Sequence, residues 1–306
     1  MSAIHTLLRH SIDYAGLFPP AGLPMSEAVD NFARYVHDPS SWALARFVVP
    51  AQRLREFETA AYPHLARPAS RPWRLSALLG DLDRDIAAVA EFNGRSGSRS
   101  NDCTGALIDS VELKADSTDS VQYALQRLPS HLQAYIEIPI AGDPADLIRQ
   151  INRAGRRAKV RTGGTETVAF PRTADLARFI VSCVRTAVAF KATAGLHHPF
   201  RAEYRLTYDP DSPRGTMFGF LNLFLAAAFV RSGLDQQSAE RVLEEGSPEA
   251  FQIEGEAICW QGHRVGLADL QQTREQVMVS FGSCSFTEPL QELHALHLLH
   301  PKVPQT

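Results

Sequence analysis

The chain has 306 residues, of which 44% are hydrophobic and 21% are charged, a composition typical of a globular protein with a sizeable core. Its formal net charge is −3 and its pI is near 6.4, which removes the general electrostatic case for binding nucleic acid or a membrane surface. The cysteines lie far apart without a CxxC pair, so they predict reduced thiols and neither a disulfide nor a zinc framework. They are Cys103, Cys183, Cys259 and Cys284.

The N-terminal residues do not predict a signal peptide. They lack the apolar core and the cleavage site of a signal peptide, and the longest apolar run, residues 216–230, falls short of the roughly 20 residues that span a bilayer. We therefore expect a cytoplasmic protein in which this run is a buried helix. Residues 1–40, with a helix at 26–36, are expected to form an extension packed on the main fold. Within it, residues 13–20 could plug one end of the fold or bring Asp13 and Tyr14 over its centre.

After this extension, strand-like and helix-like segments alternate. Strands are expected at residues 46–50, 74–79, 110–114, 134–139, 157–162 and 187–193. Helices are expected between them at residues 52–62, 81–92, 117–128, 144–154 and 174–186. Such repeated units favour a parallel sheet, and this many in series favour a closed (β/α)8 TIM barrel over an open sheet.

A helical insertion, about residues 196–250, interrupts the alternation after the sixth expected strand. Its helices are expected at residues 215–231 and 236–245. The last two strands are expected at residues 251–259 and 279–284, with helices at 267–277 and 289–299. Residues 41–306 are thus predicted to form one barrel that carries the insertion.

Two short segments place a lysine where an apolar strand runs into a glycine turn. They are Lys159-Val-Arg-Thr-Gly-Gly and Lys191-Ala-Thr-Ala-Gly. A lysine is unfavourable in a buried strand unless its charge has a partner or a task. Two lysines on neighbouring strands are expected to lower each other's pKa and to leave one amine partly neutral, as a nucleophile must be. Their nitrogens are expected in one lumen, within roughly 8 Å of each other.

Further charged residues belong to the same pattern, because alternate side chains share one face of a strand. Four positive and two negative side chains are expected to converge near the strand ends. These are Glu112, Lys114, Glu137, Lys159, Arg161 and Lys191. The surplus of cations indicates a small anionic substrate, with Lys114 and Arg161 as candidates to hold it. A buried ion-pair network without catalysis is the alternative.

The two lysine segments resemble the K-x-x-T-G and K-A-S-G-G segments of deoxyribose-phosphate aldolase and related class I aldolases with (β/α)8 barrels. In that family the first lysine forms a Schiff base with the substrate carbonyl and the second lowers its pKa. The resemblance implies that Lys159 is the nucleophile and Lys191 its electrostatic partner, although their roles could be exchanged. Glu112 or Glu137 would orient the lysines or relay protons, and no metal or other cofactor is expected. The family carries its lysines on strands six and seven, whereas the expected strands place these on five and six.

Polar residues follow the sixth and the last expected strands. His197 and His198 could contact substrate, shuttle protons or bind a metal, although no HxH or HExxH spacing supports a metal site. Ser283 and Ser285 precede a helix N-terminus, where backbone N–H groups suit an anion, so both are candidate substrate contacts. Cys284, between them, is interpreted as a buried thiol and not as a nucleophile.

Three functional hypotheses remain at this stage. The first is an aldolase-type lyase that acts on a small anionic carbonyl compound. The second is a metal-dependent hydrolase or isomerase that uses His197, His198 and the two glutamates. The third is a non-catalytic barrel that binds a ligand or a partner, with the helix at 216–230 covered in a homo-oligomer. No nucleic acid or membrane partner is expected.

Overall fold

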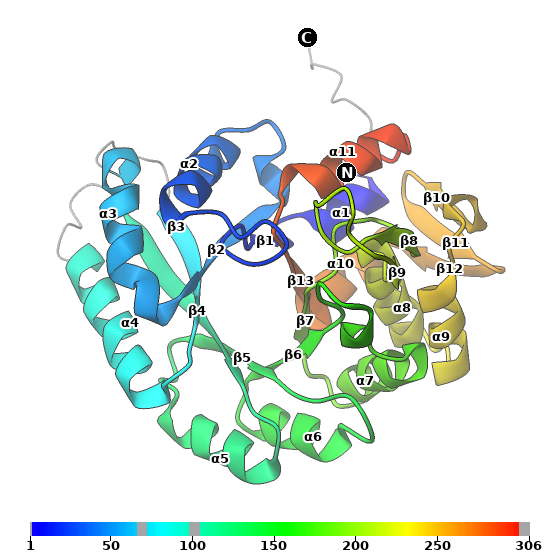
Figure 1. Cartoon of the computed structure of the whole chain (residues 1–306). Coiled ribbons are helices and arrows are strands. Elements are labelled where there is room, and N and C mark those ends of the chain that lie inside the picture. The colour runs from blue at the N-terminus through cyan, green and yellow to red at the C-terminus, as the bar shows by residue number, and fades with distance from the viewer. Residues whose placement is uncertain (1, 66–71, 98–104, 300–306) are drawn as a thin grey trace.

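The computed structural model describes residues 2–65, 72–97 and 105–299, and these form a closed eight-stranded barrel surrounded by helices (Figure 1). Every strand is parallel to both neighbours, in the order β1-β13-β7-β6-β5-β4-β3-β2. The predicted (β/α)8 barrel class is therefore confirmed. The barrel strands are β1 (Ile12–Tyr14), β2 (Leu44–Pro50), β3 (Trp73–Leu78), β4 (Ala106–Lys114), β5 (Gln133–Glu137), β6 (Arg157–Arg161), β7 (Phe190–Thr193) and β13 (Met278–Ser283).

Helices cover the outside of the barrel, and two small antiparallel sheets lie beside it. The helices are α1 (Ala3–Leu8), α2 (Met25–Val36), α3 (Leu54–Leu65), α4 (Leu82–Gly97), α5 (Thr118–Arg127), α6 (Ala145–Arg153), α7 (Thr173–Arg185), α8 (Phe220–Arg231), α9 (Gln236–Glu244), α10 (Leu267–Gln276) and α11 (Thr287–Ala295). The small sheets consist of β8 (Ala202–Arg205) with β9 (Arg214–Met217), and of β10 (Phe251–Glu254), β11 (Ala257–Trp260) and β12 (His263–Gly266).

The N-terminal segment supplies a strand of the barrel, which corrects its interpretation as an extension only. β1 pairs with β13 on one side and β2 on the other, so it closes the sheet. A strand of three residues is too short to show the period of two by which strands are recognised. Counted from β1, Lys159 lies on the sixth barrel strand and Lys191 on the seventh.

The strand expected at residues 251–259 is not part of the barrel. Its residues form β10 and β11, which pair as an antiparallel hairpin, and β12 extends the same sheet. Figure 1 shows this sheet at the edge of the molecule beside α9. The eighth barrel strand, β13, begins near the expected position, so the insertion lies between the seventh and eighth strands and is only partly helical.

The apolar run at 216–230 forms most of α8, which is buried along its length. Every residue from Phe220 to Val230 is buried, against neighbouring helices and β13. The hypothesis that this helix is covered in a homo-oligomer is therefore wrong, because the chain's own elements already cover it. No helix in the described part of the chain has the length and apolar character needed to cross a bilayer.

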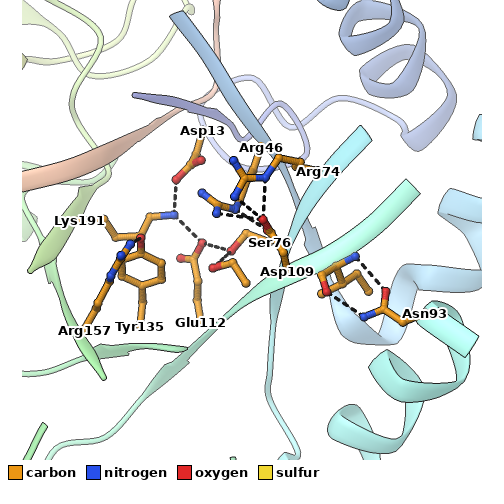
Figure 2. A network of polar contacts seen from close by, with 12 residues as sticks. Asp13, Arg46, Arg74, Ser76, Asn93, Asp109, Glu112, Tyr135, Arg157 and Lys191 are labelled. Atoms are coloured by element: carbon orange, nitrogen blue, oxygen red, sulfur yellow. Dashed lines mark hydrogen bonds and ion pairs between the residues drawn. The ribbon is translucent and has the colours of Figure 1, made fainter. Parts of the chain in front are cut away.

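Alternation along the strands divides the barrel interior from the apolar layer beneath the helices. On β7, Phe190 points outward and packs edge-on against Phe179 of α7, with ring centroids 5.2 Å apart. On β13, Phe281 stacks on Phe220 of α8 at 4.8 Å. Lys191, the residue after Phe190, points to the other side of the strand, toward Asp13 and Glu112 in the lumen (Figure 2).

Candidate active site in the barrel lumen

The two lysines lie side by side in the lumen and share one carboxylate. Lys159 and Lys191 are paired in register on β6 and β7. Lys159 Nζ lies 2.9 Å from Glu112 Oε2, and Lys191 Nζ lies 2.6 Å from Glu112 Oε1. Because both amines contact the same carboxylate, they lie within the roughly 8 Å expected from the spacing of neighbouring strands. A second carboxylate, Glu137, lies 2.9 Å from Lys159 Nζ.

Asp13 is the third carboxylate of the network, and it comes from β1. Its Oδ2 lies 2.6 Å from Lys191 Nζ, so Lys191 is held between Asp13 and Glu112 (Figure 2). The sequence left two alternatives for residues 13–20, a plug at one end of the barrel or a segment that brings Asp13 over the lumen. The structure shows Asp13 in the lumen. Tyr14 points the other way, into a cluster of aromatic rings that includes Phe32 and Phe47.

Glu112 is buried and fully partnered. Besides the two lysines, it accepts a hydrogen bond of 2.7 Å from the Ser76 hydroxyl on β3. Burial by itself raises the pKa of Glu112, but the positive charges of Lys159 and Lys191 outweigh it and hold that pKa well below its ordinary value. The carboxylate is therefore ionised at neutral pH. Ser76 is not among the site residues predicted from the sequence, although it is a polar residue between the apolar Leu75 and Ala77 of β3.

The charge balance of the lumen differs from the expected surplus of cations. The buried network holds two lysines and three carboxylates. Lys114, at the end of β4, is 76% exposed and lies 3.7 Å from Glu137. Arg161 is exposed at the end of β6, where its Nε donates to the Gly163 carbonyl. Both cations therefore lie outside the buried network, each at the last residue of its strand.

The expected mutual lowering of the lysine pKa values is wrong for Lys191. Burial lowers the pKa of Lys191, but the carboxylates of Asp13 and Glu112 outweigh burial and hold it above its ordinary value. The ring of Tyr135 also faces Lys191 Nζ, 5.3 Å from its centroid. Lys191 therefore carries a positive charge at neutral pH.

A cavity of about 210 Å³ opens on the lysines at the end of the barrel where the strands finish. Active sites of such barrels lie at this end. Both lysines, Glu112 and Arg161 line the cavity, together with the segment that follows β1 and the loops after β6, β7 and β13. Lys114 is not among the described residues that line it.

The glycine turns of the two lysine segments bring their loops into contact. The Thr162 hydroxyl donates a hydrogen bond of 2.7 Å to the carbonyl of Ala194, which joins the loop after β6 to the loop after β7. Gly195 has a φ of +72°, and a Cβ there would lie 3.0 Å from Phe170 and 3.3 Å from the Gly163 Cα. Gly163 and Gly195 must be small because the two loops and the ring of Phe170 pack directly on one another.

His197 lines the cavity and forms a polar cluster at its mouth. Its Nδ1 lies 3.8 Å from Cys284 Sγ and 3.2 Å from a carboxylate oxygen of Glu288. The hydroxyl of Tyr208 contacts both of these partners, at 3.5 and 3.1 Å. Burial lowers the pKa of His197, but the contacts with Cys284 and Glu288 outweigh it and raise that pKa to about 9. Cys284 is buried, as its interpretation from the sequence required, and it also lines the cavity.

His198 points away from the lysines. It stacks on Tyr204 with ring centroids 3.4 Å apart, and its Nδ1 contacts Glu292. Candidate ligand atoms of His198, Glu288 and Glu292 lie within 4.8 Å of one another, so these residues could hold a metal ion. The hypothesis that the two histidines form a metal site with the glutamates of β4 and β5 is therefore wrong in its ligands, because the carboxylates beside the histidines come from α11.

Ser283 and Ser285 serve the local backbone. The Ser283 carbonyl accepts from the Ala15 N–H, and the Ser285 hydroxyl accepts from the N–H of Glu288 in the first turn of α11. Neither serine is among the described residues that line the lysine cavity. Cys103 lies outside the described residues.

Comparisons with known proteins give no relative for this chain: no family model, no curated protein and no solved structure matches it.

Proposed function

We propose that the protein is a lyase of aldolase type that acts on a small anionic carbonyl compound through a lysine Schiff base. The observation that carries the proposal is the placement of two lysines in one cavity of a chain that has very few. Lysine and arginine together number 31, and only four are lysines: Lys114, Lys159, Lys191 and Lys302. Arginine could supply the charge of a buried ion pair, but it stays protonated and cannot form a Schiff base.

The contacts favour Lys159 as the nucleophile. Lys191 lies between two carboxylates at 2.6 Å and keeps its proton, so it acts as a fixed positive charge. Lys159 makes longer contacts of 2.9 Å, and the one negative charge of Glu112 is divided between both lysines. The Lys159 side chain is 8% exposed, whereas that of Lys191 is 1% exposed, so Lys159 is the amine that a carbonyl compound in the cavity reaches more readily. Glu112 and Glu137 both contact the attacking amine and orient it.

The cavity fits a small substrate with a negative charge. Its volume of about 210 Å³ suits a carbonyl compound of a few carbon atoms. Arg161 lines it and offers a guanidinium to a carboxylate or phosphate. His197, protonated at neutral pH, can donate the proton needed when the carbonyl oxygen leaves as water.

Borohydride trapping tests the proposal. Reduction with a panel of small keto acids and sugar phosphates should add the mass of one ligand at Lys159, read by peptide mass spectrometry. Lys159→Arg should lose the adduct. Lys114→Arg, which changes a lysine outside the cavity, should keep it. A ligand that binds but never forms an adduct would reject the covalent mechanism and favour a non-catalytic barrel that binds it.

A metal-dependent reaction is the second candidate, favoured by the proximity of His198, Glu288 and Glu292. Hydrolase or isomerase chemistry at this cluster would require stoichiometric zinc, manganese or iron in the purified protein. Metal analysis before and after treatment with a chelator tests this, with His198→Gln as the variant. Loss of activity with the metal, together with unchanged trapping at Lys159, would assign the reaction to the cluster.

A further inference from the structure

A second cavity lies at the opposite end of the barrel, where the strands begin. Its volume is about 320 Å³. Among the described residues that line it are four arginines, Arg46, Arg74, Arg156 and Arg157, and a single acidic residue, Asp109. Three of the arginines lie within the first residues of β2, β3 and β6. The described linings of the two cavities have no residue in common.

The described lining of this cavity holds one carboxylate for four guanidinium groups, and Asp13, whose charge also acts on Arg46, is already paired with Lys191 in the lumen. Arg46 and Arg74 both bind Asp109, at 2.7 and 2.6 Å, so one carboxylate serves two guanidinium groups (Figure 2). Arg157 donates to the hydroxyl of Tyr135 at 2.8 Å, and this phenol is a neutral partner.

Arg156 is also held by neutral groups, since it donates to backbone carbonyls, including that of Leu132 at 2.8 Å. Hydrogen bonds to neutral oxygens satisfy the N–H donors but leave the charges in place. The imbalance is local, because the whole chain has a net charge of −3.

A fifth arginine, outside the described lining of the cavity, interacts with two of these four. Arg274, near the end of α10, has a pKa that is lowered to about 10, and burial is the main cause. Tyr135 and Asp13 raise this pKa, whereas the positive charges of Arg46 and Arg157 lower it further. Its Nε is a buried donor without a hydrogen-bond partner in the described part of the chain. Mutual repulsion of guanidinium groups in a partly buried space is a cost that a bound anion would remove.

We propose that this arginine cavity, lined by Arg46, Arg74, Arg156 and Arg157, binds a small anion that carries a phosphate or carboxylate group. Guanidinium groups match the geometry of both oxyanions and bind them in bidentate fashion. The volume is in the range of small-molecule sites. The site is independent of the reaction proposed for the lysine cavity, so either proposal can fail without the other.

Binding of inorganic phosphate and of citrate to the full-length protein tests the site, with sodium chloride of equal ionic strength as the reference. We expect one ion per chain by isothermal titration calorimetry and a rise in Tm of about 2–4 °C at saturating anion. Arg157→Gln should weaken binding at least tenfold, since it removes a charge but keeps a donor for Tyr135. Arg74→Gln, at a half-exposed position, should weaken it as well and provides a second test if the first variant is unstable.

Arg161→Gln is the matched control, because it removes an arginine from the lysine cavity at the other end of the barrel. It should leave the affinity for phosphate at the arginine cavity unchanged. Absence of any Tm rise beyond that with chloride would overturn the proposal and leave the arginines a structural role. The proposal would also be overturned if Arg161→Gln abolished binding while Arg157→Gln and Arg74→Gln did not.

Discussion

Glu112 is the residue on which the position of both lysines depends. Replacing it with glutamine removes one buried negative charge from between two ammonium groups. We expect Glu112→Gln to lower the free energy of unfolding by about 3–5 kcal/mol at pH 7, measured by urea denaturation. Glu203→Gln removes an exposed partner of Arg214 and should cost less than about 1 kcal/mol. Equal losses in the two variants would contradict the network.

The pH dependence of Glu112→Gln has a defined sign. The pKa of Glu112 is lowered on folding from its ordinary value of 4.5. Its ionisation therefore stabilises the native state above about pH 4.5, and that contribution is lost as the pH falls toward the folded-state pKa. The difference in unfolding free energy between the wild type and Glu112→Gln should accordingly shrink below pH 4.5.

His197 gives the opposite pH dependence. Its pKa is raised on folding from 6.5 to about 9. The stabilisation is therefore complete below pH 6.5 and is lost as the pH rises through 9, for a total of up to about 3 kcal/mol. Urea unfolding of the wild type and of His197→Gln at pH 6 and pH 9.5 should show the loss in the wild type alone. His263→Gln, at an exposed position, should behave as the wild type does.

The polar residues of the lumen were predictable where they lie on strands with visible alternation. Glu112, Lys159 and Lys191 each lie between two apolar residues of a strand, and the period of two assigns them to one face. The sequence did not decide whether Asp13 lies in the lumen or in a plug, because its strand has only three residues and shows no alternation of polar and apolar side chains. The carboxylate partners of His197 and His198 come from α11, far along the chain, and no local signal encodes such a contact.

The turn after β7, which contains Gly195, holds the loop after β7 against the loop after β6. Gly195→Ala would force a Cβ against Phe170 and the backbone of Gly163 at a φ of +72°. Gly155→Ala is a matched control, since Gly155 has a φ of +63° with open space around its Cβ position. Both variants bear the cost of positive φ, and we expect Gly195→Ala to be less stable by about 1 kcal/mol more, because it also overpacks the loop contact.

Thermal unfolding of both glycine variants measures this difference, and borohydride trapping shows whether the loop shift reaches Lys159. Equal stability of the two variants would mean that the loops after β6 and β7 separate without cost.

Elements inside the strand-helix repeat are predictable from the sequence, and those of the insertion are less so. Helices such as α7 and strands such as β6 follow the expected ranges closely. β10 and β11 together match the one strand expected at residues 251–259, although Gly255 marks the turn between them. The same residues could have been recognised as a hairpin from that glycine, since the two halves are equal in length.

The closed barrel makes a prediction about the whole molecule, because its closure depends on β1. The N–H of Phe281 donates to the Ser11 carbonyl, and the N–H of Ala15 donates to the Ser283 carbonyl, both at 2.8 Å. A closed sheet has no edge, so its strands open together with the global unfolding transition. We expect the amides of residues 11–15 to exchange with deuterium as slowly as those of β6.

Hydrogen exchange followed by peptide mass spectrometry measures this directly. The hairpin of β8 and β9 is the internal reference, because it is a two-stranded sheet with mostly exposed or half-buried residues and should exchange much faster. If residues 11–15 exchanged as fast as that hairpin, β1 would be a loosely packed segment and the barrel would open between β2 and β13. Lys191 would then lose Asp13 in the open state, and its fixed charge beside Lys159 would rest on Glu112 alone.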